Sequence, residues 1–261
     1  MRIRKYVIGI VAGLAAAVVL SSVASAAVTG LSIEYSVTPS KGDKKIRNGV
    51  STSFVSDDVH DGFLPCPLGT ADTAGCRAYP PSRKSVVTFS KNLQFNPGNL
   101  PDCNLGQLVG KTSAQALSSC PRSHVGEGTN TQLFSDGRTL DGLITIFNGA
   151  PTGGNPTIYL HVDVPGVETK PILNATIRGN VATVDIPPIP GSVIERFAIT
   201  FDKTVTAQKK NRKTGKVKKT FYQMGNCSQR NFITREDVTY ADGTTLSATV
   251  PGRCTRTKKK R

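Results

Sequence analysis

The sequence predicts an all-β chain, and three observations support this prediction. Thr, Val, Gly and Pro are abundant and Trp is absent, a composition that favours strands and turns. Long runs of Leu, Glu, Lys and Ala, which favour helices, are almost absent. Short apolar segments are separated by Gly, Pro and Asp turns, with no room for a helix between strands. We therefore expect an antiparallel β-sandwich, immunoglobulin-like or jelly-roll-like, with one short helix and disulfide-tied loops.

The first 26 residues have the three-part pattern of a secretory signal peptide. A basic start (Arg2, Arg4 and Lys5) is followed by an uncharged run over 7–20 and by small residues up to Ala26. The apolar run is shorter than the roughly 20 residues of a membrane span. We expect cleavage near Ala26, no transmembrane segment after cleavage, and a secreted protein, extracellular or in the cell envelope.

The expected organisation has three parts. A signal peptide covers residues 1–26, a single β-sandwich domain covers 27–254, and a disordered basic tail covers 255–261. A chain of this length is long enough for one β-domain with a sizeable core.

The first elements combine two strands with polar excursions. Residues 31–37 alternate apolar and polar side chains with period two, which predicts a half-buried strand. The polar residues 39–50 predict a loop, and residues 57–84, rich in Asp, Pro and Gly, predict an irregular segment tied by a disulfide. A second strand is expected from Ser85 to Phe95, before an Asn-Pro-Gly turn.

The only helix that the sequence predicts begins after Thr112. Thr112 and Gln115 fit a capping box, in which each side chain bonds to the backbone N–H of the other residue. The helix should end by Pro121.

Strands follow one another in the second half of the chain. They are expected at residues 143–147, 157–164, 172–177, 181–186 and 193–201. Asn148-Gly149 is expected to form the turn after the first of these strands. Near the end, Asp242-Gly243 predicts a hairpin turn between strands at 238–240 and 246–250.

Six cysteines follow the leader, and an even number in an exported chain predicts disulfides. Six cysteines allow fifteen pairings, which the sequence does not decide between. We favour pairing of sequence neighbours, namely Cys66–Cys76, Cys103–Cys120 and Cys227–Cys254. A metal site is the weaker alternative, because no C-x-x-C motif occurs and Cys120-x-x-x-His124 has no second ligand pair.

The segments around the middle cysteines resemble a known pattern. Leu100-Pro101-Asp102-Cys103 is followed by Cys120-Pro121-Arg122-Ser123-His124-Val125-Gly126, which is similar to a pattern in exported β-rich proteins of actinobacteria. The resemblance covers roughly residues 85–254 and implies an exported, β-rich protein. It supplies no catalytic residue, because that family has no assigned activity. The segment of Cys66–Cys76 and the basic stretch described next look like local additions.

The formal net charge of +15 is concentrated in short segments. Apart from the leader, one basic stretch lies over 209–219 and another over 253–261, and the rest of the chain is near neutral. The first stretch contains seven basic residues: Lys209, Lys210, Arg212, Lys213, Lys216, Lys218 and Lys219. Thr214-Gly215 predicts a turn that makes this stretch a hairpin with lysines on both arms.

Two interpretations of the basic hairpin remain open. Lysines along a strand edge discourage aggregation between sheets, which is a structural role. Polyanion binding is the functional alternative, with anionic wall polymers or lipid headgroups as the expected partners. No aromatic residue lies among the lysines, so we expect no specific binding of nucleic acid.

No catalytic, metal or cofactor site is predicted. The three histidines are His60, His124 and His161, and Ser123 is a neighbour of His124 only along the chain. The carboxylates of Asp57, Asp58 and Asp61 suit calcium, but their spacing does not match a known loop, and a solvated turn is the favoured interpretation.

The sequence therefore favours a binding or structural protein outside the cell over an enzyme. Its ligand and oligomeric state are not predicted. The alternative is a secreted hydrolase that acts on a polysaccharide or an ester, whose active site would appear only in three dimensions.

Overall fold

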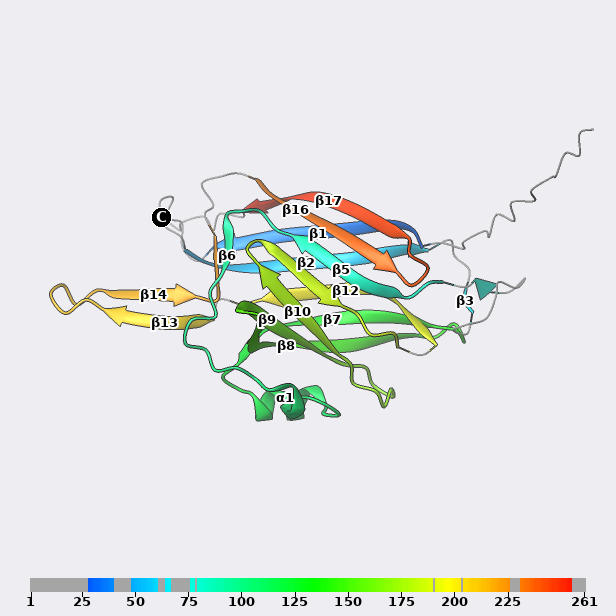
Figure 1. The fold of residues 1–261 in the computed structure, drawn as a ribbon, viewed down its shortest axis with the longest axis horizontal. Coiled ribbons are helices and arrows are strands. Elements are labelled where there is room, and N and C mark those ends of the chain that lie inside the picture. The colour runs from blue at the N-terminus through cyan, green and yellow to red at the C-terminus, as the bar shows by residue number, and fades with distance from the viewer. Residues whose placement is uncertain are drawn as a thin grey trace, which may run out of the picture.

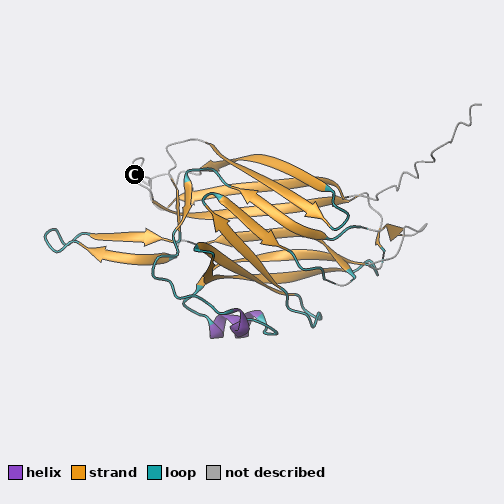
Figure 2. Ribbon diagram, in the orientation of Figure 1, coloured by secondary structure: helices purple, strands orange, loops and turns teal. Residues whose placement is uncertain are grey.

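The computed structural model describes residues 28–39, 48–60, 64–66, 76–77, 79–189, 191–202, 204–225 and 231–254. In these described residues strands dominate the fold and one short α-helix accompanies them, as Figure 2 shows. The largest sheet contains thirteen strands. In chain order they are β1 (Val28–Pro39), β2 (Asn48–His60), β5 (Ser82–Thr88), β6 (Leu93–Phe95), β7 (His124–Phe134), β8 (Thr139–Thr152), β9 (Asn155–Asp163), β10 (Ile172–Arg178), β11 (Val181–Asp185), β12 (Ser192–Phe201), β15 (Gln223–Gly225), β16 (Asn231–Tyr240) and β17 (Thr245–Cys254).

Two further sheets have two strands each. One pairs β3 (Leu64–Pro65) with β4 (Cys76–Arg77). The other is a hairpin of β13 (Val205–Lys210) and β14 (Val217–Phe221), which projects from the body at the left of Figure 1. The predicted basic hairpin is therefore present.

The large sheet curls into a half-barrel (Figure 1). Its strand order is β1-β17-β16-β5-β11-β10-β9-β8-β7-β12-β2-β15-β6, and β1 also pairs with β2. The β1–β2 pairing is long and antiparallel, whereas β1 and β17 are parallel and pair only through Ser36 with Arg253 and Val37 with Cys254.

The predicted all-β, antiparallel class is confirmed, but the predicted two-sheet sandwich is not. Hydrogen bonding continues from strand to strand through one curled sheet instead of stopping between two stacked sheets. Period-two alternation predicts that one face of each strand is buried, and this holds for both architectures. Only the strand order distinguishes them, and that order depends on contacts between distant segments.

The hydrophobic core fills the inside of the curl. In β10, for example, Leu173, Ala175 and Ile177 are buried on one face, as period two requires. Aromatic rings close one end of this core: the ring centroids of Phe95 and Phe201 are 6.0 Å apart, and those of Phe201 and Tyr222 are 6.3 Å apart. Such contacts add to the energy of apolar burial.

The predicted helix is confirmed as α1 (Ser113–Ser119), preceded by the 3-10 turn η1 (Leu105–Gln107). Both hydrogen bonds of the capping box are present between Thr112 and Gln115. Ala116 packs with Phe147 of β8 in a small cluster outside the main core. Among the residues that the structure describes, no helix is long and apolar enough to cross a bilayer.

Two of the three expected disulfides lie within the described residues. Cys103–Cys120 ties α1 to the segment that pairs with β8 at Gly149, and Cys66–Cys76 links β3 to β4. The third pair includes Cys227, which lies outside the described residues, as do the leader and the tail over 255–261.

The predicted turn at Asn148-Gly149 is wrong. Both residues lie inside β8, and the hairpin turn to β9 is formed by Gly153 and Gly154, which have φ angles of 57° and 77°. A side chain at position 149 would overlap the ring of Tyr159 on β9, so only glycine fits there. Asn148 donates a hydrogen bond from Nδ2 to Oδ1 of Asp102, at 2.9 Å. An Asn-Gly pair therefore serves packing here, not reversal of the chain.

Three other boundaries differ from the prediction. β2 begins at Asn48, within the expected loop, and continues to His60, so Asp57 and Asp58 are strand residues. The expected strand over 85–95 is divided into β5 and β6 by a turn at Lys91 and Asn92. The polar composition of 57–60 suggested a turn, but strand pairing with β1 and β12 overrides that local preference.

Candidate functional site

The basic hairpin is the first candidate site. All seven basic residues predicted for polyanion binding lie on or between β13 and β14, and all are exposed. Lys209 lies directly opposite Lys218 in the register. The turn is ordered by Asn211, whose Oδ1 accepts hydrogen bonds from the backbone N–H groups of Lys213 and Thr214.

The positive charge of the hairpin is not neutralised within the described residues. Their ion pairs join Arg138 with Asp136, Lys170 with Asp163, Arg196 with Asp57, and Arg235 with Asp237, so none involves the hairpin. Like charges that face each other across two strands are destabilising. The hairpin therefore carries a high density of exposed positive charge, which an external anion can contact.

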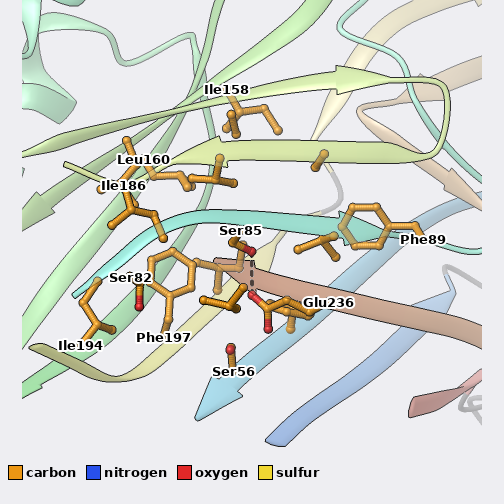
Figure 3. Close-up of a pocket in the computed structure, with 18 of the residues that line it drawn as sticks. Ser56, Ser82, Ser85, Phe89, Ile158, Leu160, Ile186, Ile194, Phe197 and Glu236 are labelled. Atoms are coloured by element: carbon orange, nitrogen blue, oxygen red, sulfur yellow. Dashed lines mark hydrogen bonds between the residues drawn. The ribbon is translucent and has the colours of Figure 1, made fainter. Parts of the chain in front are cut away.

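The second candidate site is a cavity inside the curled sheet, with a volume of about 90 Å³ (Figure 3). Most of its lining is apolar and comes from β9, β10, β11 and β12, with Ile158, Leu160 and Phe197 among the contributing side chains. The polar lining gathers on β2, β5 and β16. Its members are Thr52, Ser56, Asp58, Ser82, Ser85 and Glu236, and Glu195 of β12 adds a further carboxyl group.

Strand geometry places these polar groups inside. On β2, alternation directs Phe54, Ser56 and Asp58 to the same face. On β16 the same rule directs Glu236 inward with Val238, both of which line the cavity. On β12 a register shift between Ile194 and Arg196 marks a bulge at Glu195. Bulges redirect side chains and are frequent beside functional sites.

Glu236 is the most deeply buried charged group of the cavity, with 3% of its surface exposed. Its Oε1 accepts a hydrogen bond of 2.6 Å from Oγ of Ser85, whereas its Oε2 is buried without a partner. Burial raises the pKa of Glu236, and the hydroxyl groups of Ser85 and Ser56 oppose this effect.

Asp58 is the second interior carboxyl group. Its Oδ1 accepts a hydrogen bond of 2.8 Å from the hydroxyl of Tyr240, a residue with 2% of its surface exposed. Burial raises the pKa of Asp58 to about 7, and the negative charge of Glu236 contributes to the increase. The pKa of Tyr240 is also raised, by burial and by the neighbouring Asp58 carboxylate. Two acids therefore share one low-dielectric environment.

The histidines do not form a catalytic arrangement in the described part of the chain. His161 is fully buried, and its Nε2 contacts the backbone oxygen of Lys111 at 2.8 Å. Neither His161 nor His124 makes a hydrogen bond to a hydroxyl or a carboxylate among the described residues. The hydroxyl of Ser123 donates to the backbone oxygen of Pro101, at 2.7 Å.

Metal ligands do not gather in the described residues either. No group of three or more His, Cys, Asp or Glu side chains there has the geometry to hold an ion. Asp58 points into the cavity, and Asp57 pairs with Arg196 outside it, so these two carboxylates, which calcium would need together, diverge. Asp61, the third, lies outside the described residues.

The sequence identified the hairpin but missed the cavity. The local sequence predicts a solvated turn at Asp58 and no special role for Glu236. The available signal was the alternation in Phe232-Ile233-Thr234-Arg235-Glu236-Asp237-Val238, which places Glu236 on the same face as Phe232 and Val238.

Comparison with known proteins adds nothing to this geometry. No protein-family model, no curated protein and no solved structure matches the chain.

Proposed function

We propose that this chain is an exported, disulfide-stabilised binding protein that associates with polyanions at or outside the cell envelope. One observation carries the proposal: seven cations project from the body on a two-stranded hairpin without a paired acid among the described residues. The leader pattern over 1–26 and the disulfides support an oxidising location. The resemblance to exported actinobacterial proteins points in the same direction.

Edge protection explains only part of this charge. Both arms of the hairpin are sheet edges, and lysines on the arms would discourage unwanted strand pairing. Arg212, Lys213 and Lys216 lie in the turn, which has no edge to protect. Since like charges in a hairpin cost stability, these additional cations favour an external partner.

Anionic wall polymers and anionic lipid headgroups are the partners that this charge suits. The interaction is a matter of charge density, because no aromatic side chain for stacking lies among the basic residues over 209–219. Binding of this kind weakens as salt rises, since the exposed charges are screened over about 8 Å at physiological ionic strength.

A charge-matched pair of variants tests the proposal. The hairpin variant replaces Lys209, Lys210, Lys218 and Lys219 with Gln, and the control replaces the exposed Lys84, Lys91, Arg122 and Arg178 with Gln. Both variants lose four positive charges. Retention is measured by co-sedimentation with insoluble cell-wall material and with vesicles of phosphatidylglycerol and phosphatidylcholine, over a salt series.

The hairpin variant should lose most of its low-salt binding, whereas the control should retain most of it. Stronger retention of the unmodified protein on cell-wall material would identify wall polymers as the partner, and stronger retention on vesicles would identify lipid headgroups. Equal losses in both variants would show that net charge, not the hairpin, determines binding, and salt-independent retention would exclude the electrostatic mechanism.

A further inference from the structure

The interior cavity has a chemical asymmetry that the hairpin does not explain. Among the residues that the structure describes, its lining contains three carboxyl groups, on Asp58, Glu195 and Glu236, and no Lys, Arg or His side chain. Apart from a few hydroxyl groups, the remaining surface is hydrocarbon, contributed by residues such as Ile158 and Phe197 (Figure 3). An apolar pocket with a few convergent polar groups is the usual form of a small-molecule site.

The unpartnered oxygen of Glu236 is the second observation. Glu236 is almost completely buried and lines the cavity, yet its Oε2 has no hydrogen-bond partner. In Figure 3 its carboxyl group lies beside Ser85 and extends toward Ser56. A buried polar atom that makes no bond is costly, so it marks a place where an additional donor would be stabilising.

A bound cation would stabilise the carboxylates of Asp58 and Glu236 inside the cavity. Asp58 and Glu236 interact unfavourably when both are charged, and the described part of the lining offers no cation. Buried charges are normally paired. A ligand that carries a carboxylate would add another negative charge, whereas a ligand that carries an ammonium group would supply the missing one through charge-assisted hydrogen bonds.

We take the end of the cavity lined by Asp58, Glu195 and Ile186 as the route of entry. Asp58 lies two residues before the end of β2, Glu195 is the fourth residue of β12, and Ile186 follows β11. The β2–β12 register pairs Asp57 with Arg196, so Asp58 and Glu195 lie close together. All three side chains are half-buried, unlike Glu236 deeper inside. The opposite end is closed by the aromatic side chains of Phe89, Phe95 and Phe201.

We propose that this cavity binds a small aliphatic amine, with the hydrocarbon chain against the apolar wall and the ammonium group between Glu236 and Asp58. The volume of about 90 Å³ limits the buried part to a short hydrocarbon chain. The carboxyl group of Glu195 at the entrance favours cations over anions during entry.

The test uses primary alkylamines from butylamine to octylamine, with alkanoates and alkanols of the same lengths as matched probes. Binding to the full mature protein is measured by isothermal titration calorimetry. Affinity for amines should rise by about fourfold per methylene until the cavity is full, and then level off. Alkanols should bind at least tenfold more weakly than amines, and alkanoates more weakly still.

Three variants locate the site. Glu236→Gln keeps the shape of the side chain and removes its charge, so it should weaken amine binding by at least tenfold. Glu127→Gln removes an exposed charge on β7 and should leave amine binding unchanged. Ala175→Leu fills the cavity without touching its carboxyl groups and should also reduce binding. Thermal unfolding confirms that each variant is folded.

Several results would overturn the proposal. These are equal or stronger binding of alkanoates, unchanged amine binding by Glu236→Gln, or no amine binding up to the solubility limit. The charge-reduced hairpin variant should bind amines normally, so failure of the polyanion proposal and failure of this one are distinguishable.

Discussion

At the scale of the residue, Asp58 couples protonation to folding. Burial raises its pKa to about 7, whereas a carboxyl group in the unfolded chain has a pKa near 4. Between these values the folded protein keeps a proton that the unfolded chain releases, so the unfolded state gains stability as pH rises. Below pH 4 both states are protonated and the effect is absent. Glu236, whose pKa is also raised, acts in the same direction.

We predict that the free energy of unfolding decreases as the pH is raised from 4.5 to 8. For Asp58 the decrease is at most about 4 kcal/mol, since one pKa unit corresponds to about 1.4 kcal/mol. Asp58→Asn should reduce this pH dependence and raise stability at pH 8. Asp57→Asn, on the opposite face of β2, removes the smallest of the contributions that raise the pKa of Asp58, so it should change this pH dependence much less than Asp58→Asn does. Urea unfolding followed by circular dichroism measures both, and a wild-type protein that is equally stable at pH 5 and pH 8 would contradict the coupling.

The residues of the hairpin and those of the cavity differ in how far the sequence reveals them. The lysines are adjacent along the chain and exposed, so their role as a charged surface follows from composition alone. Asp58 and Glu236 are 178 positions apart, and they meet only because β2 and β16 both face the inside of the curl. The sequence does not show that two residues so far apart along the chain share one cavity, although the alternation of apolar and polar residues indicates that each side chain faces inward.

At the scale of the element, two glycines set the distance between β7 and β12. A Cβ atom at Gly126 would overlap the carbonyl oxygen of Thr200, and one at Gly128 would overlap that of Ala198. Backbone atoms of a central strand cannot move aside as a flexible side chain can. The absence of side chains at these positions therefore permits close contact between the two strands.

Gly128→Ala should consequently destabilise the protein by about 1–3 kcal/mol, the usual cost of overpacking. Gly106→Ala is the matched control, because no atom lies within 4 Å of a Cβ there and the backbone is not in the left-handed region. Thermal unfolding of both variants checks the prediction. If the two variants have the same melting temperature, β7 and β12 are not closely packed at Gly128.

Sequence motifs correctly predict those elements whose conformation is determined by residues close together along the chain. The capping box placed α1, and Asp242-Gly243 placed the turn between β16 and β17. Asn148-Gly149 failed, because contacts with Asp102 and Tyr159 from other segments determine its conformation. A dipeptide that commonly turns therefore predicts a turn only where no partner strand holds it extended.

At the scale of the whole molecule, the sheet joins segments that are distant along the chain. β5 lies between β11 and β16, and β2 lies between β1 and β12. Neither arrangement follows from hairpin rules, which explains why a sandwich was expected. The same topology brings the first described strand into contact with the last one.

Folding should be slow for this reason. Domains dominated by long-range strand pairing fold in milliseconds to seconds, because chain entropy is lost before those contacts form. Stopped-flow refolding of the oxidised protein, followed by tyrosine fluorescence, measures the rate. Complete refolding within microseconds would contradict the prediction.

The short parallel contact between β1 and β17 also affects synthesis. A ribosome delivers β1 first, but its partner β17 is the last of the described strands to emerge. Until then the nascent chain carries an uncovered strand edge, a surface that other copies can extend. A polypeptide truncated before Thr245 would keep that edge permanently.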